Sequence, residues 1–449
     1  MALDTAIRRS PYWPVLTHPS FRRVLPGLFV SALGDGMGLL AVSWLAMQLA
    51  PAAHRGTWIG VAVAAYTLPG AVGTVAFGRW LRGHRGARLA GWDAALRCAA
   101  LAAIPVAHLA GVLGIELYVV LLATSALLHS WGSAGRFTLI AEIFTARHRL
   151  PANAVLTTIS EFATIVGPPL AGLLAGWVGV VWVLAIDAGT FAVLALTYRL
   201  ALPPGDRAAP SPTEPLTTDR ATPAAGGSSR GEGFAVLRRN PELLGLLGLT
   251  FGFFFLFGPV YVALPLLVVG DLHGSAATLG AFYTAFGVGA LMGGLGTGYL
   301  RRWRRWPAVL GIVTGFGAAM LPLGLGAPTA LALGCMGVAG LAWAPYMSMS
   351  MSIFQQSVDT ARLPQVLAAN GAVTVLAVPL GSALGGPLTA ALGARGTLLV
   401  EAVGTVALGA VDAGILLARR AARPGGRADE SGSRAAGSRT GVPPARSGG

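Results

Sequence analysis

The chain has 449 residues, of which 54% are hydrophobic and only 11% are charged, and its formal net charge is +14. Soluble globular domains carry about 25% charged residues, so this composition excludes that class of protein. All 32 strongly basic residues are arginines spread over many connections, so we expect them to meet anionic lipid headgroups and not nucleic acid.

Apolar residues come in blocks long enough to cross the hydrocarbon of a membrane, which takes about 20 residues of helix. The alternating pattern of a β-barrel is absent, so the blocks are expected to be helices. The predicted fold class is an all-α polytopic membrane protein with about twelve transmembrane helices in two pseudo-symmetric six-helix halves. The expected spans lie near 24–48, 57–79, 88–112, 115–137, 153–176, 178–199, 242–268, 275–300, 306–327, 329–352, 366–392 and 397–418.

The arginines predict how these spans thread the membrane. They cluster before the first span, in every second connection and after the last span, whereas the opposite side holds only Arg55 and Arg395. Because cytoplasmic loops carry an excess of basic residues, both termini are expected to be cytoplasmic. A cell (plasma) membrane protein that spans the bilayer many times is the predicted localisation.

The chain is predicted to divide at one long polar break. Residues 201–233 are rich in Pro, Ala, Ser, Thr, Gly and Arg, a composition typical of a flexible linker. Arg149-Leu150-Pro151 of the first half reappears as Arg362-Leu363-Pro364 in the second, and paired halves are typical of secondary transporters. The predicted organisation is a cytoplasmic N-terminus (1–23), a six-helix bundle (24–200), a cytoplasmic linker (201–241), a second six-helix bundle (242–418) and a disordered cytoplasmic tail (419–449).

Three carboxylates lie inside spans of the first half. Asp35 is in the first span, Glu161 in the fifth and Asp187 in the sixth. A charge in mid-membrane costs on the order of 2.5–3.5 kcal/mol to insert, so such residues suggest function. Any of the three could couple proton entry to substrate exit. The alternative is a carboxylate that neighbouring hydroxyls or amides satisfy and that only packs.

A further charged pair lies in the third span. Asp93 and Arg97 are four residues apart, a spacing that permits an ion pair within one helix. Arg97 is the only arginine that we place clearly inside a span, and Asp93 is its expected partner. We interpret the two as gate or structural residues rather than as substrate contacts.

The second half offers aromatic residues in place of mid-span charges. Candidates for the aromatic lining of a substrate-binding site are Phe255 and Tyr261 in the seventh span, and Trp343 and Tyr346 in the tenth. Such linings adapt to irregular apolar ligands. The alternative is that these side chains pack inside the bundle or face lipid.

Several stretches make the chain resemble the major facilitator superfamily, and in particular its drug-efflux branch of macrolide-efflux and enterobactin-exporter-like proteins. The resemblance covers roughly residues 20–420. The stretches that carry it are RLPANAVLTTISEFATIVGPPLAGLLAG (149–176), GFAVLRRNPELL (233–244) and QQSVDTARLPQV (355–366).

Two motifs of that family can be located. Its antiporter motif in the fifth helix requires a Gly-Pro pair with nearby glycines, which corresponds here to Gly167-Pro168. Its gating loop after the second helix reads GRWLRGHRGARLAG (78–91), with Gly78, Arg82 and Arg85, but it lacks the acid that the family usually carries there. The resemblance therefore implies that the interaction of this acid is absent or rebuilt.

The composition also excludes several functions. Without lysine the chain can build neither a Walker A phosphate loop nor a Schiff base to retinal or pyridoxal. No enzyme motif and no metal-spaced His/Cys cluster occurs, so we expect no enzyme activity, no cofactor and no metal. The expected function is proton-coupled export of a small lipophilic drug or secondary metabolite by alternating access, by a chain that the resemblance implies to be a monomer. The alternative is transport of another solute, such as a siderophore, a lipid or an imported metabolite, on the same fold.

Overall fold

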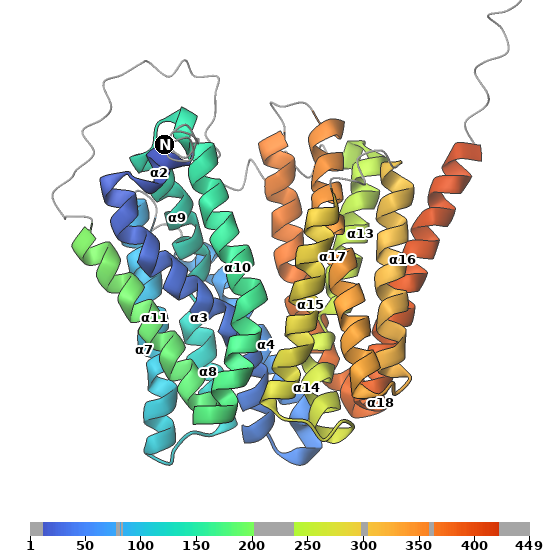
Figure 1. Ribbon diagram of the computed structural model, residues 1–449, viewed down its shortest axis with the longest axis horizontal. Helices are drawn as coiled ribbons and strands as arrows, with labels where there is room; N and C mark the ends of the chain where they lie inside the picture. The colour runs from blue at the N-terminus through green and yellow to red at the C-terminus, as the bar shows by residue number, and fades with distance from the viewer. Residues whose placement is uncertain are drawn as a thin grey trace, which may run out of the picture.

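The computed structural model describes residues 12–77, 81, 84–201, 238–297, 304–358 and 363–421, and over these ranges the chain is helical with no strand. Figure 1 shows two helical bundles side by side, the N-terminal one in blue and green and the C-terminal one in yellow to red. The N-terminal half contains α2 (Trp13–Leu16), α3 (Pro19–Leu49), the 3-10 turn η1 (Ala52–His54), α4 (Arg55–Thr67), α5 (Pro69–Ala76), α7 (Gly86–Leu109), α8 (Ile115–Ala126), α9 (His129–Ile143), α10 (Ala146–Val178) and α11 (Val180–Ala201). The C-terminal half contains α13 (Pro241–Phe257), α14 (Val260–Gly270), α15 (Ala276–Gly296), α16 (Arg305–Gly324), α17 (Thr329–Ser357) and α18 (Leu363–Ala421).

Ten segments of the described chain are long and apolar enough to cross a membrane. One of them, 373–416 within α18, holds two spans, because Gly393 breaks the helix with a φ of 72° that favours glycine. The second expected span is missing from the ten because Pro69, which lacks an N–H, divides it into α4 and α5. With these two additions the described helices match the expected set of about twelve spans.

Local sequence signals explain several helix starts. Asn240 accepts hydrogen bonds from the backbone N–H groups of Glu242 and Leu243 at 3.1 and 3.4 Å, and Pro241 occupies the first turn of α13. Ser275 and Thr278 form a reciprocal capping box at the start of α15. Side-chain oxygens here satisfy N–H groups that have no partner within the helix.

Each bundle is held by helix packing around an apolar core. In the N-terminal half α3 packs against α10, α11 and α4, and α7 packs against α9 and α11. In the C-terminal half α15 packs on α17, α16 on α17 and α18, and α13 on α18. The two most extensive contacts between the halves are those of α10 with α15 and of α4 with α18, and α14 adds smaller contacts with α3 and α4.

Glycines allow the closest approaches between the halves. A Cβ on Gly60 of α4 would lie 2.6 Å from the Ser382 carbonyl oxygen, and one on Gly172 of α10 would lie 2.9 Å from the Gly280 Cα. These positions lie toward the end of the molecule opposite the start of α3 and the end of α18, where α4 begins and α10 ends (Figure 1). Backbones without side chains between them can pack this closely in a membrane protein.

Arg395, one of the two arginines expected on the side with few charges, forms an ion pair with Asp271. The Arg395 Nε donates to the Asp271 Oδ1 at 2.7 Å and joins two connections of the C-terminal half. Both side chains are partly exposed, so this ion pair contributes little to stability.

The expected domain boundaries stay a prediction over much of the chain. The linker residues 202–237, the first eleven residues and the tail from 422 lie outside the described ranges. Within those ranges the first bundle begins earlier than expected, because α3 starts at Pro19.

Candidate functional site

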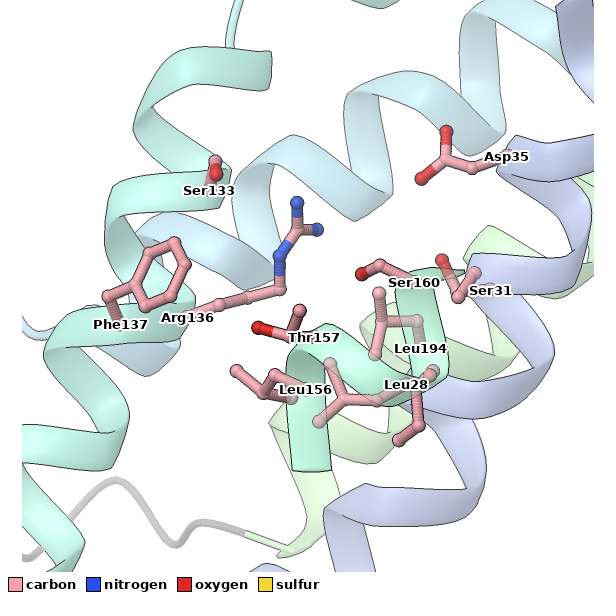
Figure 2. A pocket seen from close by; sticks show the side chains of 12 residues that line it. Leu28, Ser31, Asp35, Ser133, Arg136, Phe137, Leu156, Thr157, Ser160 and Leu194 are labelled. Atoms are coloured by element: carbon pink, nitrogen blue, oxygen red, sulfur yellow. The ribbon is translucent and has the colours of Figure 1, made fainter. Parts of the chain in front are cut away.

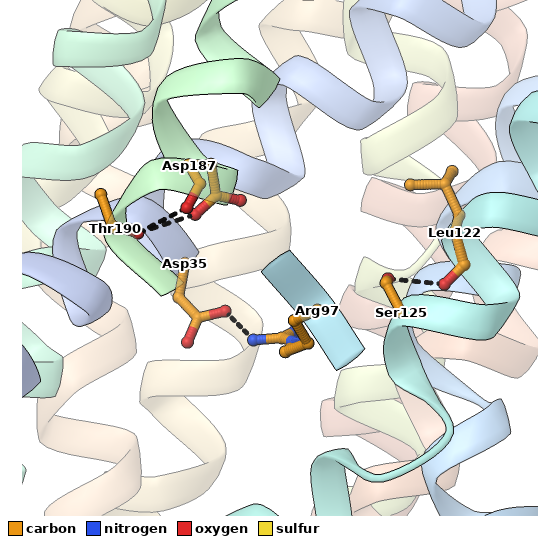
Figure 3. Close-up of polar contacts among 6 residues, drawn as sticks. All are labelled: Asp35, Arg97, Leu122, Ser125, Asp187 and Thr190. Carbon is orange, nitrogen blue, oxygen red and sulfur yellow. Dashed lines mark hydrogen bonds and ion pairs between the residues drawn. The ribbon is translucent and has the colours of Figure 1, made fainter. Parts of the chain in front are cut away.

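The centre of the N-terminal half holds an ion pair between two helices. Arg97 of α7 donates from its Nη1 to the Oδ1 of Asp35 of α3 (Figure 3). The Arg97 side chain is 2% exposed and that of Asp35 is 32% exposed. A charge-assisted bond therefore links a buried guanidinium to a carboxylate that solvent can still reach.

The expected pairing of Arg97 with Asp93 is wrong. The four-residue spacing allows that contact, but Asp93 turns toward α9, where a Cβ on Gly132 would overlap the Asp93 carboxylate. The Asp93 Oδ1 has no hydrogen-bond partner. The glycine at position 132 leaves room for the Asp93 carboxylate against α9.

Aromatic rings complete the surroundings of Arg97. Its guanidinium carbon lies 4.6 Å from the ring centre of Phe191 of α11 and 5.5 Å from that of Tyr66 of α4. Both distances are typical of cation–π interactions, which partly replace the lost hydration of a buried guanidinium.

Asp187 of α11 belongs to the same cluster. It is fully buried and packs on α3 at Gly34, where any side chain would overlap the Asp187 Oδ1. The Thr190 hydroxyl donates to the Asp187 carbonyl oxygen at 2.7 Å and lies 3.4 Å from its Oδ1, while the Oδ2 has no partner. Figure 3 shows Asp187 and Asp35 on neighbouring helices. Two of the three expected mid-span acids are thus brought together, and the side chain of the third, Glu161, lies outside the described part of the structure.

A cavity of about 190 Å³ opens beside Asp35 and was not expected from the sequence. It lies between α3, α9, α10 and α11, and Figure 2 shows Arg136 reaching into it from α9. Its polar lining residues are Ser31, Asp35, Ser133, Arg136, Thr157 and Ser160. The expectation that Arg97 is the only arginine inside a span is wrong, because α9 continues to Ile143 and encloses Arg136.

The glycines of the fifth-helix motif have separate contacts. A Cβ on Gly167 would overlap the backbone of Gly36 on α3 within the same half, whereas Gly172 meets Gly280 across the two halves. The carbonyl oxygen of Pro168 also lies against Gly280, 3.3 Å from where its Cβ would be. Gly176 faces open space, so only part of the motif is needed for close packing.

The gating loop is described only in part, because Gly78 and Arg82 lie outside the described residues. Arg85 precedes the first turn of α7. The Glu142 Oε1, from the end of α9, accepts a hydrogen bond from the Gly86 backbone N–H at 3.1 Å. A carboxylate from another helix therefore stands at the start of α7, where the positive end of the helix dipole favours it.

The four aromatic candidates lie in the C-terminal half, while all residues that line the cavity beside Asp35 belong to the N-terminal half. Tyr346 is fully buried and its hydroxyl donates to the Thr250 Oγ1 at 2.8 Å. Trp343 packs on Phe257 with ring centres 5.0 Å apart. In this conformation Tyr346 is part of the bundle core and Trp343 packs against it.

The other two aromatic candidates are less buried. Phe255 stacks on Phe251 at 5.8 Å, and Tyr261 stacks on Tyr283 at 6.4 Å. Phe255 and Tyr261 are each partly exposed, and neither lines the cavity beside Asp35.

Similar folds occur among solved transporters. A bacterial homologue of the human lysosomal transporter Spinster, in an inward-facing and unoccupied conformation, matches with a TM-score of 0.67 over 92% of this chain and 98% of that one, at 13% identity. A bacterial homologue of the iron transporter ferroportin, in an inward-facing state, matches with a TM-score of 0.62 over 86% of this chain and 98% of that one, at 15% identity. At these identities the likeness concerns the fold alone.

Curated relatives match a smaller part of the sequence. Macrolide efflux protein A of Streptococcus pyogenes is 26% identical over 156 residues, which are 34% of this chain and 38% of the streptococcal protein. Macrolide efflux protein A of Enterococcus faecalis is 26% identical over 153 residues, 33% of this chain and 47% of that protein. The chain thus matches less than half the length of these relatives.

A family model matches most of the sequence. The model of the Major Facilitator Superfamily aligns with residues 24–361 and, in a second alignment, with residues 259–445. Together with the two six-helix bundles, this match identifies the chain as a transporter protein, and the resemblance seen in its motifs is confirmed. The chain belongs to the Major Facilitator Superfamily.

Proposed function

We propose that this chain is a proton-coupled exporter of lipophilic drugs or secondary metabolites, with Asp35 as the group that exchanges the proton. The observation that carries the proposal is the ion pair of Asp35 with Arg97. The partial exposure of Asp35 toward a cavity gives a proton a route to it, while Arg97 is held in the protein interior.

Protonation of Asp35 has a physical consequence for Arg97. A neutral Asp35 no longer balances the guanidinium, and leaving one member of a buried pair without its partner costs about 3–5 kcal/mol. The partial exposure of Asp35 lowers this cost. A few kcal/mol suffice to change which of two conformations is populated, so the protonation state of Asp35 can drive the transition.

Two other acids can pair with the Arg97 guanidinium when Asp35 is protonated. Asp93 and Asp187 both lie close enough to Arg97 to interact with it electrostatically, and each has a carboxylate oxygen without a hydrogen-bond partner. In the proposed cycle Arg97 moves toward one of them when Asp35 is neutral. A shift of α7 against α3 would follow, because the arginine is anchored on α7.

The two halves are proposed to rock about their contacts and so alternate access. The close glycine contacts lie at the end opposite the start of α3 and the end of α18, and in the proposed orientation this end faces the outside and is closed. We place the protein in the cell membrane on the basis of its arginine distribution. The partial match to macrolide efflux proteins supports a macrolide as the first substrate to test.

The test uses everted membrane vesicles from a host that lacks its own drug pumps. Respiration acidifies the vesicles, and addition of a macrolide should dissipate the pH gradient when the wild-type chain is present. Asp35→Asn should abolish this dissipation while the protein remains inserted. Asp412→Asn, which changes an acid of the C-terminal half far along α18, is the matched control and should behave as wild type. If Asp35→Asn dissipates the pH gradient as fast as the wild type does, Asp35 is not the group that couples proton movement to transport.

Substrate choice is tested separately by growth. The same host should gain resistance to macrolides or to other lipophilic antibiotics when it expresses the chain. Absence of protection across a broad panel, with normal amounts of protein in the membrane, would favour transport of another solute.

A further inference from the structure

Arg136 has no ionic partner, although it lies within a transmembrane helix. Among the described residues, the ion pairs are those of Arg97 with Asp35 and of Arg395 with Asp271. Arg136 makes neither an ion pair nor a hydrogen bond with any described residue, yet it lies in the cavity beside Asp35 (Figure 2). A guanidinium in such a place calls for a counterion.

The hydroxyl groups around Arg136 also make no hydrogen bonds with the described residues. Most serines and threonines in the described helices donate to a carbonyl oxygen three or four residues earlier, as Thr158 and Thr164 do on the same helix α10. By contrast, four hydroxyl groups that line the cavity have no hydrogen-bond partner among the described residues, and these belong to Ser31, Ser133, Thr157 and Ser160. Hydroxyls and a guanidinium without partners therefore converge on one small space from three helices.

Neither of the acids near the cavity, Asp35 and Asp93, forms an ion pair with Arg136. Asp35 is engaged by Arg97, whose charge compensates it. Asp93 points instead toward Gly132 and is not one of the lining residues. Asp35 and Asp93 both lie within electrostatic reach of Arg136, but neither forms an ion pair or a hydrogen bond with it. The lining thus presents a guanidinium that makes no ion pair with a described residue, together with several hydroxyl donors, an arrangement that can bind an oxyanion.

We propose that this cavity is a subsite for the anionic group of an amphiphilic substrate, a carboxylate, sulfonate or phosphate, with Arg136 as its counterion. The inference rests on the proposed transport function and names a class of substrate, anionic amphiphiles, in addition to the macrolides proposed above. The apolar part of such a molecule has a surface to meet in Leu28, Phe137 and Leu156, which line the same cavity.

The size of the cavity supports a subsite rather than a complete binding site. Pockets for drug-sized ligands span roughly 300–1,000 Å³. A volume of about 190 Å³ accommodates a charged headgroup with a few water molecules. The remainder of an amphiphile would extend past Phe137, which is 54% exposed.

The test measures binding to the purified full-length protein in a neutral detergent, without any proton gradient. The probes are 11-(dansylamino)undecanoic acid, its methyl ester and the corresponding primary amine, whose dansyl fluorescence rises on binding. The wild type should bind the carboxylate about tenfold or more tightly than the ester, because one charge-assisted bond is worth about that factor. The amine should bind no better than the ester.

Two variants assign the preference to Arg136. Arg136→Gln should lower affinity for the carboxylate to that of the ester and leave the ester unchanged, whereas Arg136→Lys should retain part of the preference. Arg147→Gln, at an exposed arginine of α10, is the matched control and should keep the full preference. Unchanged binding of the ester shows that Arg136→Gln is folded.

Three results would overturn the proposal. They are equal affinity of the wild type for carboxylate and ester, absence of carboxylate binding by the wild type, and a preference that survives in Arg136→Gln. None of them bears on proton coupling, which is measured in vesicles with the Asp35 variant. Failure of the subsite and failure of the proposed transport function can therefore be told apart.

Discussion

Asp35 of α3 and Arg97 of α7 form an ion pair across a separation of 62 residues in the chain. The arginine approaches from the third span, is buried, and faces rings of α4 and α11 on its other sides. The pair therefore ties together four helices of the N-terminal half. A substitution that weakens this ion pair should therefore lower both the stability of the protein and its transport rate.

The first prediction concerns the energy of this pair. Asp35→Asn and Arg97→Gln should each lower the free energy of unfolding by roughly 1–3 kcal/mol, less than the ~3–5 kcal/mol of a fully buried pair because Asp35 is partly exposed. The double variant should be less destabilised than the sum of the two, since neither residue then leaves a partner unpaired. Thermal unfolding of the four proteins in detergent measures the coupling. Strict additivity would show that the two side chains do not stabilise each other.

A second prediction tests how Asp187 is held against α3. Gly34→Ala places a methyl group on the Asp187 carboxylate and the Thr190 hydroxyl, so it should destabilise the protein by about 1–3 kcal/mol and reduce transport. Gly189→Ala on α11 is the matched control, because no atom lies within 4 Å of the added methyl group. It should be neutral or stabilising by up to ~1 kcal/mol. Equal melting temperatures for the two variants would contradict the packing described here.

The third prediction separates the glycines of the fifth helix. Gly167→Ala should lower the melting temperature because it separates α10 from α3 inside one half. Gly172→Ala should instead weaken the contact between the halves at Gly280, and so populate conformations that are open at that end. Gly176→Ala should resemble wild type.

The opening can be followed by labelling. In a background with Cys98 and Cys335 replaced by alanine, Thr389→Cys reports on the contact between the halves, because Thr389 is 8% exposed and packs against Gly56. A polar maleimide should label it slowly in the parent and several-fold faster with Gly172→Ala. The same rate in both would argue against Gly172 as a contact that holds this end closed.

The fourth prediction concerns Tyr346. Tyr346→Phe removes the hydrogen bond to Thr250 and should cost about 1 kcal/mol of stability, without altering the KM for whichever substrate the transport test identifies. Phe255→Ala, at a partly exposed ring of α13, should raise KM if that face meets substrate. A changed KM in Tyr346→Phe with normal stability would indicate that Tyr346 contacts the substrate.

Sequence reasoning located much of the site but not its connections. Asp35 and Asp187 were found because a charge within an apolar span is conspicuous, and the structure brings both to one place. Arg97, the ion-pair partner of Asp35, is conspicuous for the same reason, but the sequence predicts Asp93 as its partner, since helical spacing reveals only neighbours on the same helix. Arg136 was overlooked because it lies at the edge of an apolar block whose helix extends further than its hydropathy suggests.

Helical spacing alone places Ser31 on the same face as Asp35, but nothing in the sequence selects Ser133 and Ser160 as residues of the same cavity. Hydroxyls are frequent in these helices, and most donate to their own backbone, as that of Thr158 does. Whether one of them faces a cavity or its own helix depends on rotation about the helix axis. That rotation is set by packing with other helices, as at Gly36 and Gly167.

The sequence by itself determined that this protein spans a membrane with about twelve helices in two halves and belongs to a transporter family, because hydrophobic length is a local property and family motifs are contiguous. Only the tertiary structure decided that Arg97 meets Asp35, that Asp187 packs on Gly34, and that Arg136 lies in a cavity where it forms no ion pair with a described residue. These relations depend on which helix faces join and how closely glycines let them approach, and they arise only when distant segments pack together.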